Sequence, residues 1–229
     1  MTLPRSMISF FRIPDLITLI NSILGFTSIF LAYIGEFHLS FSFILLAVLG
    51  DGLDGWVAGK TESGEVGAFL DSMSDLICFA VAPVFFVYLF IQDIFMGCLK
   101  CHILLVAVLT FFFISGLLRL SSYNLMKQEG YFTGLPISSA AMIIMLFVYL
   151  NLGFYVLIAV LLLLSFSMLS PLSFVKPDKK IGGIAVFLVF SAIILGKNFD
   201  SVSLWSLLIA NILYVFLSPI YLGFKNIKN

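Results

Sequence analysis

The sequence predicts an all-α, polytopic membrane protein with about eight transmembrane helices, on the basis of its composition, its apolar runs and the placement of its basic residues. Of its 229 residues, 62% are hydrophobic and 10% are charged, and the mean hydropathy is +1.18. Soluble domains have about a quarter of their residues charged. A helix needs roughly 20 residues to cross a hydrocarbon core about 30 Å thick. Residues 1–229 are therefore expected to form a single integral membrane domain.

Eight apolar runs, separated by polar residues, glycine or proline, mark the predicted spans. In chain order they cover residues 15–34, 39–58, 66–91, 103–122, 135–150, 153–169, 181–196 and 203–223. The first run has no convincing small-residue cleavage site, so we interpret it as a retained helix and not as a signal peptide. Between the fifth and sixth runs we expect a tight turn at Asn151, Leu152 and Gly153, because a single span of that length would be steeply tilted.

The positions of lysine and arginine test the number and orientation of the spans, because these residues collect in cytoplasmic loops. With eight spans and a cytoplasmic N-terminus, Lys100 and Lys197 lie outside. The cytoplasmic side holds the other basic residues: Arg5, Arg12, Lys60, Arg119, Lys127, Lys176, Lys179, Lys180, Lys225 and Lys228. This asymmetry favours the predicted topology, and the formal net charge of zero argues against nucleic acid as a partner.

Four aspartates gather at the predicted cytoplasmic ends of the second and third helices. Asp51 and Asp54 are three positions apart and Asp71 and Asp75 are four apart, so each pair shares a helix face. An aspartate at the centre of a transmembrane helix costs about 2.5–3.5 kcal/mol on insertion scales, so four aspartates need a counter-charge. Lys60 is the only basic residue between positions 13 and 99. We therefore expect divalent cations to balance these carboxylates.

The expected cations are Mg²⁺ or Mn²⁺, which prefer oxygen ligands and commonly bridge to a substrate phosphate. Two such ions about 3.5–4 Å apart bind a diphosphate and stabilise both the attacking and the leaving oxygen. Gly55 and Gly67 lie on the same helices and would let a helix or a phosphate approach the backbone. The alternative is that the aspartates are solvated helix ends or pack against small polar residues, but packing rarely places four in this register.

The aspartates belong to a longer pattern that also fixes glycine and alanine positions. It comprises Asp51, Asp54, Gly55, Ala58, Gly67, Asp71 and Asp75. The pattern resembles the signature of the CDP-alcohol phosphotransferase family, D-x-x-D-G-x-x-A-R followed by G-x-x-x-D-x-x-x-D. Here Gly59 and Lys60 replace the arginine, and the gap before Gly67 is one residue shorter. The resemblance implies that Asp51, Asp54 and Asp71 bind two metal ions. It also implies that Asp75 is the general base and contacts a metal ion.

The first predicted helix resembles that of the phosphatidylserine synthase branch of this family. The usual run there is P-N-x-x-T-x-x-N-x-x-x-G, and the matching residues are Pro14, Thr18, Asn21 and Gly25, with Asp15 in place of the first asparagine. The resemblance implies a CDP-lipid subsite formed by Asn21, Gly55, Ala58, Lys60 and Gly67, in which Lys60 replaces the cation of the missing arginine.

The acceptor is expected to be L-serine. Residues 119–124, which begin at Arg119 and end at Asn124, resemble the R-L-A-R-F-N segment of the same branch, with Ser122 in place of the second arginine. Residues 132–136 resemble its F-x-G-L-P segment. Physically, the planar fork of Arg119 suits the serine carboxylate, and Asn124 adds donors and acceptors. The alternatives are a headgroup anchor for Arg119 and a simple helix cap and turn for Asn124 and residues 134–136.

The resemblance implies transfer of a phosphatidyl or archaetidyl group from a CDP-lipid to L-serine with release of CMP, by a homodimer whose active site faces the cytoplasm. Other acceptors are inositol phosphate, glycerol phosphate, ethanolamine or choline, but phosphorylated acceptors would require more cations near the site. A cation-coupled transporter is a rival from another class, although transport carboxylates tend to lie near the bilayer midplane.

A second motif competes with this interpretation. Cys98, Cys101 and His102 form a C-x-x-C-H pattern, which is typical of covalent haem attachment. The loop between the adjacent spans is too short to enclose a haem. We therefore favour a local disulfide or free thiols.

Overall fold

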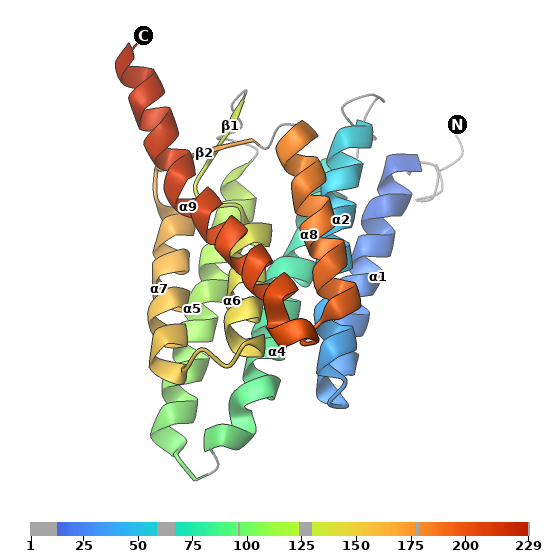
Figure 1. The fold of residues 1–229 in the computed structure, drawn as a ribbon, viewed down its shortest axis with the longest axis vertical. Helices are drawn as coiled ribbons and strands as arrows, with labels where there is room; N and C mark the ends of the chain where they lie inside the picture. Colours follow the sequence, from blue (N-terminus) through green and yellow to red (C-terminus); the bar gives the residue numbers. More distant parts are fainter. Residues whose placement is uncertain (1–12, 59–66, 96, 124–129, 177–178, 229) are drawn as a thin grey trace, which may run out of the picture.

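The structure is a computed structural model that describes residues 13–58, 67–95, 97–123, 130–176 and 179–228. Consecutive long helices run in opposite directions (Figure 1), and we call the end where α1 begins and α2 ends the upper end of the bundle. The helical elements are α1 (Ile13–Tyr33), α2 (Phe37–Ala58), α3 (Gly67–Asp75), η2 (Leu76–Val81), α4 (Ala82–Ile91), η3 (Gln92–Phe95), α5 (Leu99–Tyr123), α6 (Ile137–Tyr149), α7 (Phe154–Leu169), α8 (Lys179–Leu195), η4 (Phe199–Ser201) and α9 (Val202–Lys228).

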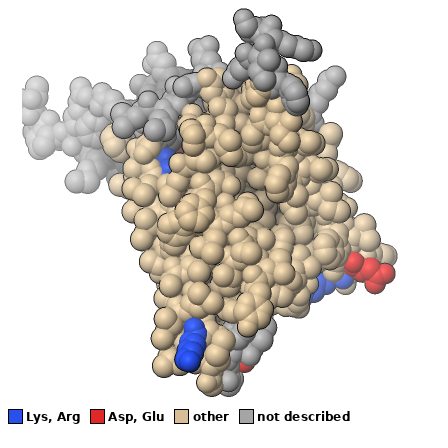
Figure 2. Space-filling view, turned by 90° about the vertical axis from the view of Figure 1, so that its left-hand side faces the viewer, with Lys and Arg blue, Asp and Glu red and all other residues tan. Residues whose placement is uncertain are grey.

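These elements confirm the all-α class and coincide with the predicted apolar runs to within a few residues, with α3, η2 and α4 forming one continuous segment. Four helices are long and apolar enough to cross a membrane: Asp15–Tyr33, Gly67–Ile91, Leu99–Ser122 and Phe199–Gly223. The apolar parts of the other four are 10–17 residues long. Figure 2 shows a face that is almost entirely uncharged across its middle, with coloured side chains near its ends. The chain is an integral membrane protein.

The predicted turn between the fifth and sixth runs is confirmed. The α6 helix ends at Tyr149 and α7 begins at Phe154. Between them Asn151 and Gly153 have φ angles of 54° and 97°, a left-handed conformation that ends a helix and reverses the chain. This reversal lets α6 and α7 pack against each other as antiparallel neighbours.

The third run is not the single regular α-helix that its apolar pattern suggested. Immediately after Asp75 the chain forms a π-helical segment, η2, in which the Ala82 amide donates to the Ile77 carbonyl five residues earlier. Pro83 follows at the start of α4, and proline has no amide hydrogen to continue regular α-helical bonding. A π-helical turn shifts the register of the side chains that follow, so the residues after Asp75 face differently from those before it.

Two short strands, which the sequence analysis did not anticipate, cover part of the upper end (Figure 1). Strand β1 (Tyr131–Thr133) pairs antiparallel with β2 (Ser173–Val175), with Phe132 opposite Phe174. Gly134 follows β1 with a φ of 74°, and its amide donates to the Leu172 carbonyl at 2.8 Å. The F-x-G-L-P segment is therefore a strand and a glycine turn that lead into α6.

The cysteine pair lies at the lower end of the bundle, at the start of α5. Cys98 and Cys101 form a disulfide with their Cα atoms 5.4 Å apart, which is one of the two arrangements that the sequence left open. The amides of Cys101 and His102 both donate to the Cys98 carbonyl, so the disulfide closes the first turn of the helix. Both sulfur atoms are bonded to each other, which leaves neither for a thioether bond to haem.

Candidate metal centre and acceptor pocket

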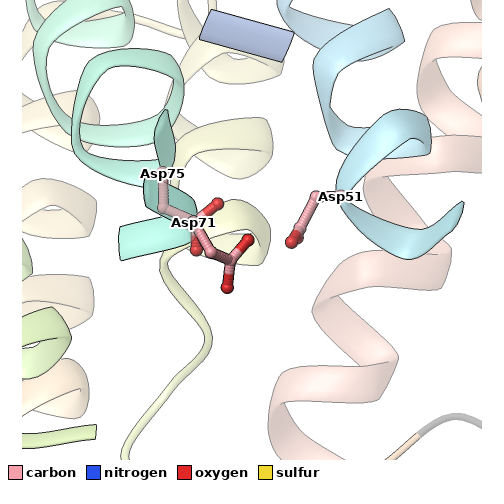
Figure 3. Close-up of side chains that lie close together, drawn as sticks. All are labelled: Asp51, Asp71 and Asp75. Carbon is pink, nitrogen blue, oxygen red and sulfur yellow. The ribbon is translucent and has the colours of Figure 1, made fainter. Parts of the chain in front are cut away.

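Three of the four predicted aspartates converge between α2 and α3. Figure 3 shows Asp51 on α2 pointing across the gap toward Asp71 and Asp75 on α3. Each carboxylate offers an oxygen atom, and these atoms lie within 4.8 Å of one another, at half-buried positions. Three carboxylates this close repel one another unless a cation lies among them. A donor set made of carboxylate oxygens fits Mg²⁺ or Mn²⁺ better than a metal that prefers sulfur or nitrogen.

Other predicted residues lie at or beyond the limit of the described structure. Asp54, Gly55 and Ala58 lie on the last turns of α2, and the Asp54 side chain falls outside the described residues. Lys60 and Asn124 also lie outside them. The structure thus brings together Asp51, Asp71 and Asp75 and leaves the predicted role of Asp54 as a fourth ligand untested.

Helix α1 fixes the position of the segment that carries Asp71 and Asp75. Ser74 donates a hydrogen bond to the Thr18 carbonyl at 3.1 Å, and the Cys78 thiol donates to the Asn21 carbonyl at 3.0 Å. Ser74 directly precedes Asp75, so this contact with α1 orients the adjacent carboxylate. Helix α1 and η2 approach each other closely at Gly25. A Cβ added at Gly25 would lie 2.6 Å from the Cys78 sulfur, so only glycine fits there without a shift.

The predicted CDP-lipid residue Asn21 lies against Gly50, the residue before Asp51. It is 4% exposed, and its amide group packs directly against the α2 backbone at Gly50, where a Cβ would overlap it. Gly50 immediately precedes Asp51. The sequence analysis did not identify Gly50, although its place directly before the first aspartate was a visible signal.

If Asn21 belongs to the CDP-lipid subsite that the resemblance implies, Gly50→Ala should displace it and weaken binding there about tenfold, because overpacking and a disturbed buried polar group each cost on the order of 1–3 kcal/mol. The KM for CDP-lipid in detergent micelles measures this effect. Gly52→Ala is the matched control. Gly52 lies on the same helix, and a Cβ added there has no neighbouring side chain or other segment within 4 Å. Equal KM values in the two variants would contradict the role of this close approach.

A buried acid on α1, Asp15, also lies close to this site. It is 4% exposed, and its Oδ1 atom is 2.9 Å from the Cβ that a side chain at Gly67 would add. Gly67 begins α3 four residues before Asp71. The missing side chain of Gly67 therefore accommodates the Asp15 carboxylate, the residue that replaces asparagine in the branch pattern. A negative group in the first turn of α1 is also favoured by the helix dipole.

A pocket surrounds Arg119, near the end of α5. It has a volume of about 100 Å³ and also includes Ser122 of α5, Thr133 of β1 and Ser170 after α7. The apolar part of its wall comes from Leu118, Met168 and Leu169. Arg119 is half-buried and lines this pocket. The sequence analysis did not assign Thr133 or Ser170 to a site, because their positions follow from the strand pair.

This pocket lies at the same end of the bundle as the aspartates. The ends of α2, α5 and α7 and the starts of α3 and α6 all lie at the upper end (Figure 1). Helix α3, which carries Asp71 and Asp75, contacts α5, which carries Arg119. An aspartate cluster that could hold a metal ion and a pocket that contains an arginine therefore lie on neighbouring helices.

Comparisons with known proteins agree with this arrangement. Residues 11–169 match the family model of CDP-alcohol phosphatidyltransferase. An archaetidylserine synthase of Methanothermobacter thermautotrophicus is 39% identical over 155 residues, which cover 66% of this chain and 63% of that protein. A CDP-diacylglycerol–serine O-phosphatidyltransferase of Methanocaldococcus jannaschii is 32% identical over 170 residues, covering 74% and 76%.

A CDP-diacylglycerol–serine O-phosphatidyltransferase of Helicobacter pylori strain 26695 is 33% identical over 142 residues, covering 60% of this chain and 57% of that protein. The matched region thus spans less than two thirds of the archaetidylserine synthase and of the Helicobacter protein. All of the aspartates discussed above lie within the residues that the family model matches.

Proposed function

The chain belongs to the CDP-alcohol phosphatidyltransferase family, and on this premise we propose that it transfers a phosphatidyl or archaetidyl group from a CDP-lipid to the hydroxyl of L-serine, releasing CMP. The observation that carries the proposal is the convergence of Asp51, Asp71 and Asp75, whose carboxylate oxygens lie within 4.8 Å of one another. The names of the relatives favour serine as the acceptor.

We assign Asp51, Asp54, Asp71 and Asp75 to two Mg²⁺ or Mn²⁺ ions. When bound, these ions would neutralise the CDP-lipid diphosphate and stabilise the negative charge that CMP carries away. The helices contribute pre-set ligand positions, since Asp71 and Asp75 share one face of α3 and the contacts with α1 orient that face. The site therefore needs little rearrangement to receive the diphosphate.

Asp75 is the proposed general base. Its carboxylate accepts the proton of the serine hydroxyl while the serine oxygen forms a bond to the lipid-linked phosphorus and the bond from phosphorus to the CMP oxygen breaks. Asp75 lies at the end of α3, directly before the π-helical segment. The helical register shifts at that point. The aspartates lie on α3 before the shift, and the buried residues Cys78, Phe79 and Ala80 lie on η2 after it.

The proposed acceptor pocket is the one around Arg119. Its guanidinium pairs with the serine carboxylate through two parallel hydrogen bonds, and the hydroxyls of Ser122, Thr133 and Ser170 accept from the serine ammonium. Asn124 is expected to contribute as the branch resemblance implies. A pocket with one arginine suits one carboxylate, whereas a phosphorylated acceptor carries two negative charges.

The proposed CDP-lipid subsite comprises Asn21, Gly55, Ala58, Lys60 and Gly67. The contact of Asn21 with the backbone beside Asp51 supports this assignment, because it places a buried amide next to a metal ligand. The contact of Gly67 with Asp15 places a second polar group of α1 at the same end.

We further propose that all eight helical segments cross the membrane, with the N-terminus and the upper end in the cytoplasm. Two features support this: the alternating helix directions, and the occurrence of Arg119 and Lys176 on segments at the upper end but Lys100 and Lys197 on segments at the lower end. The homodimer implied by the family resemblance is tested by the mass of the protein in lipid nanodiscs.

The test of this function is CMP release from CDP-diacylglycerol or CDP-archaeol with Mn²⁺ or Mg²⁺ and a panel of acceptors. We expect release with L-serine and little release with ethanolamine, choline, glycerol phosphate or inositol phosphate. Chelation of the metal with EDTA should stop the reaction. Preference for another acceptor would overturn the serine assignment, and cation flux into liposomes without CMP release would favour the transporter.

A further inference from the structure

The last helix of the bundle contacts the strand pair through specific polar side chains. The Val175 amide of β2 donates to the Ser218 hydroxyl of α9, and the Val175 carbonyl accepts a hydrogen bond from the Tyr214 hydroxyl at 3.0 Å. Ser218 is 6% exposed. The Tyr214 ring also packs against Phe174, with the ring centroids 6.3 Å apart. Two side chains one helical turn apart thus bind both backbone groups of one strand residue.

Strand β2 in turn fixes β1. Thr133 is opposite Ser173, and Tyr131 is opposite Val175, the residue that α9 binds. Beyond the strands, the Gly134 amide donates to the Leu172 carbonyl and the Lys176 amide donates to the Gly130 carbonyl at 3.2 Å. A short two-stranded pair is marginally stable by itself, so its position depends on what it packs against.

The strand pair forms one wall of the Arg119 pocket. Thr133 is the last residue of β1, and Ser170 precedes β2 by a few residues; both line the pocket with Arg119 and Ser122. Helix α9 contacts β2 directly, so it lies beside the strand pair that forms this wall. A shift of β2 would therefore move the hydroxyl groups that face Arg119.

We propose that Tyr214 and Ser218 of α9 are positioning residues that fix β2, and through it place Thr133 and Ser170 opposite Arg119 to set affinity for the acceptor. Both residues lie beyond residues 11–169, which the family model matches. The inference rests on the proposed function and deepens it, since it identifies where acceptor affinity is controlled.

The experiment compares Tyr214→Phe, Ser218→Ala and the double variant by steady-state CMP release. Each single variant removes one hydrogen bond, so we expect KM for L-serine to rise about fivefold in each and further in the double variant. KM for CDP-lipid and kcat should change less than about twofold, because the metal centre is not altered. Ser218→Thr keeps the hydroxyl and should restore most of the affinity for serine.

Two variants on the same helix are matched controls. Tyr221→Phe removes a hydroxyl from a residue that is 61% exposed. Ser206→Ala removes one that bonds to the Val202 carbonyl of its own helix. Neither residue contacts β2 through these groups, and both variants should keep the KM for serine of the unaltered protein.

Hydrogen exchange provides a readout that does not depend on activity. The amide of Val175 and those of β1 should exchange faster in the double variant, because the strand pair loses its attachment to α9. Faster exchange with an unchanged KM for serine would overturn the inference and leave the proposed function intact. A parallel rise in KM for L-serine and KM for CDP-lipid, with loss of thermal stability, would show that Tyr214 and Ser218 stabilise the whole fold. That result would also overturn the inference.

Failure of the proposed function gives a different result. If the unaltered protein releases CMP with another acceptor, the serine assignment fails, and KM for that acceptor then tests the positioning role. If no acceptor supports CMP release while CDP-lipid and metal still bind, both proposals fail.

Discussion

Asp71→Ala is expected to abolish metal-dependent CMP release, with a loss of more than about 1,000-fold, because the metal stabilises both the attacking and leaving oxygens. Asp71 provides one of three carboxylates whose oxygens lie within 4.8 Å, and alanine removes one of these ligands from the centre. The same loss is expected for Asp51→Ala, since its carboxylate is the described ligand that comes from α2.

Metal binding tests this prediction independently of turnover. Titration with Mn²⁺, followed by electron paramagnetic resonance, should show weaker binding in both variants. Asp93→Ala is the matched control, because it removes an exposed carboxylate in η3, at the opposite end of the bundle. Mn²⁺ affinity equal to that of the unaltered protein in Asp51→Ala and Asp71→Ala would contradict the assignment of this cluster as the metal centre.

Asp75→Asn is expected to reduce kcat by about 10²–10⁴-fold while CDP-lipid still binds. The amide has nearly the shape of the carboxylate and so preserves packing beside Ser74, but it does not accept the serine proton. Binding of CDP-lipid by isothermal titration, together with single-turnover CMP release, separates these two steps. Asp71→Ala should behave differently, because Mn²⁺ binding and turnover are expected to fall together in that variant.

Asp75→Glu is the matched comparison, because it keeps a carboxylate at the same position on α3. It should retain more activity than Asp75→Asn, although the longer side chain moves the oxygen atoms. Full turnover in Asp75→Asn would contradict the assignment of Asp75 as the general base. The assignment of Asp51 and Asp71 as metal ligands would stand, since these two residues are tested separately.

Local sequence patterns determined much of the candidate site. The four-residue spacing of Asp71 and Asp75 places both on one face of a helix, and the short segment after Asp51 brings that face back to α2. The break at residues 151–153 was predictable because glycine and asparagine readily adopt positive φ angles. Such features depend on chain neighbours, and a sequence shows those directly.

Contacts between distant segments were not predictable in this way. The approach of Asn21 to Gly50 joins α1 to α2, and nothing near either residue specifies the other as its partner. The π-helical segment after Asp75 was also missed, because an apolar run shows the same hydropathy whether its turns are α or π.

The strand pair shows the same limit most clearly. Residues 131–133 and 173–175 are three residues each, too short for the alternation of apolar and polar residues to indicate a strand. Their pairing depends on α6 and α7 returning the chain to the upper end and on Tyr214 and Ser218 binding Val175. The sequence by itself determined the membrane class, the helices and the aspartate register, since these follow from composition and spacing. Only the tertiary structure decided the wall of the Arg119 pocket, because long-range hydrogen bonds between separate segments build it.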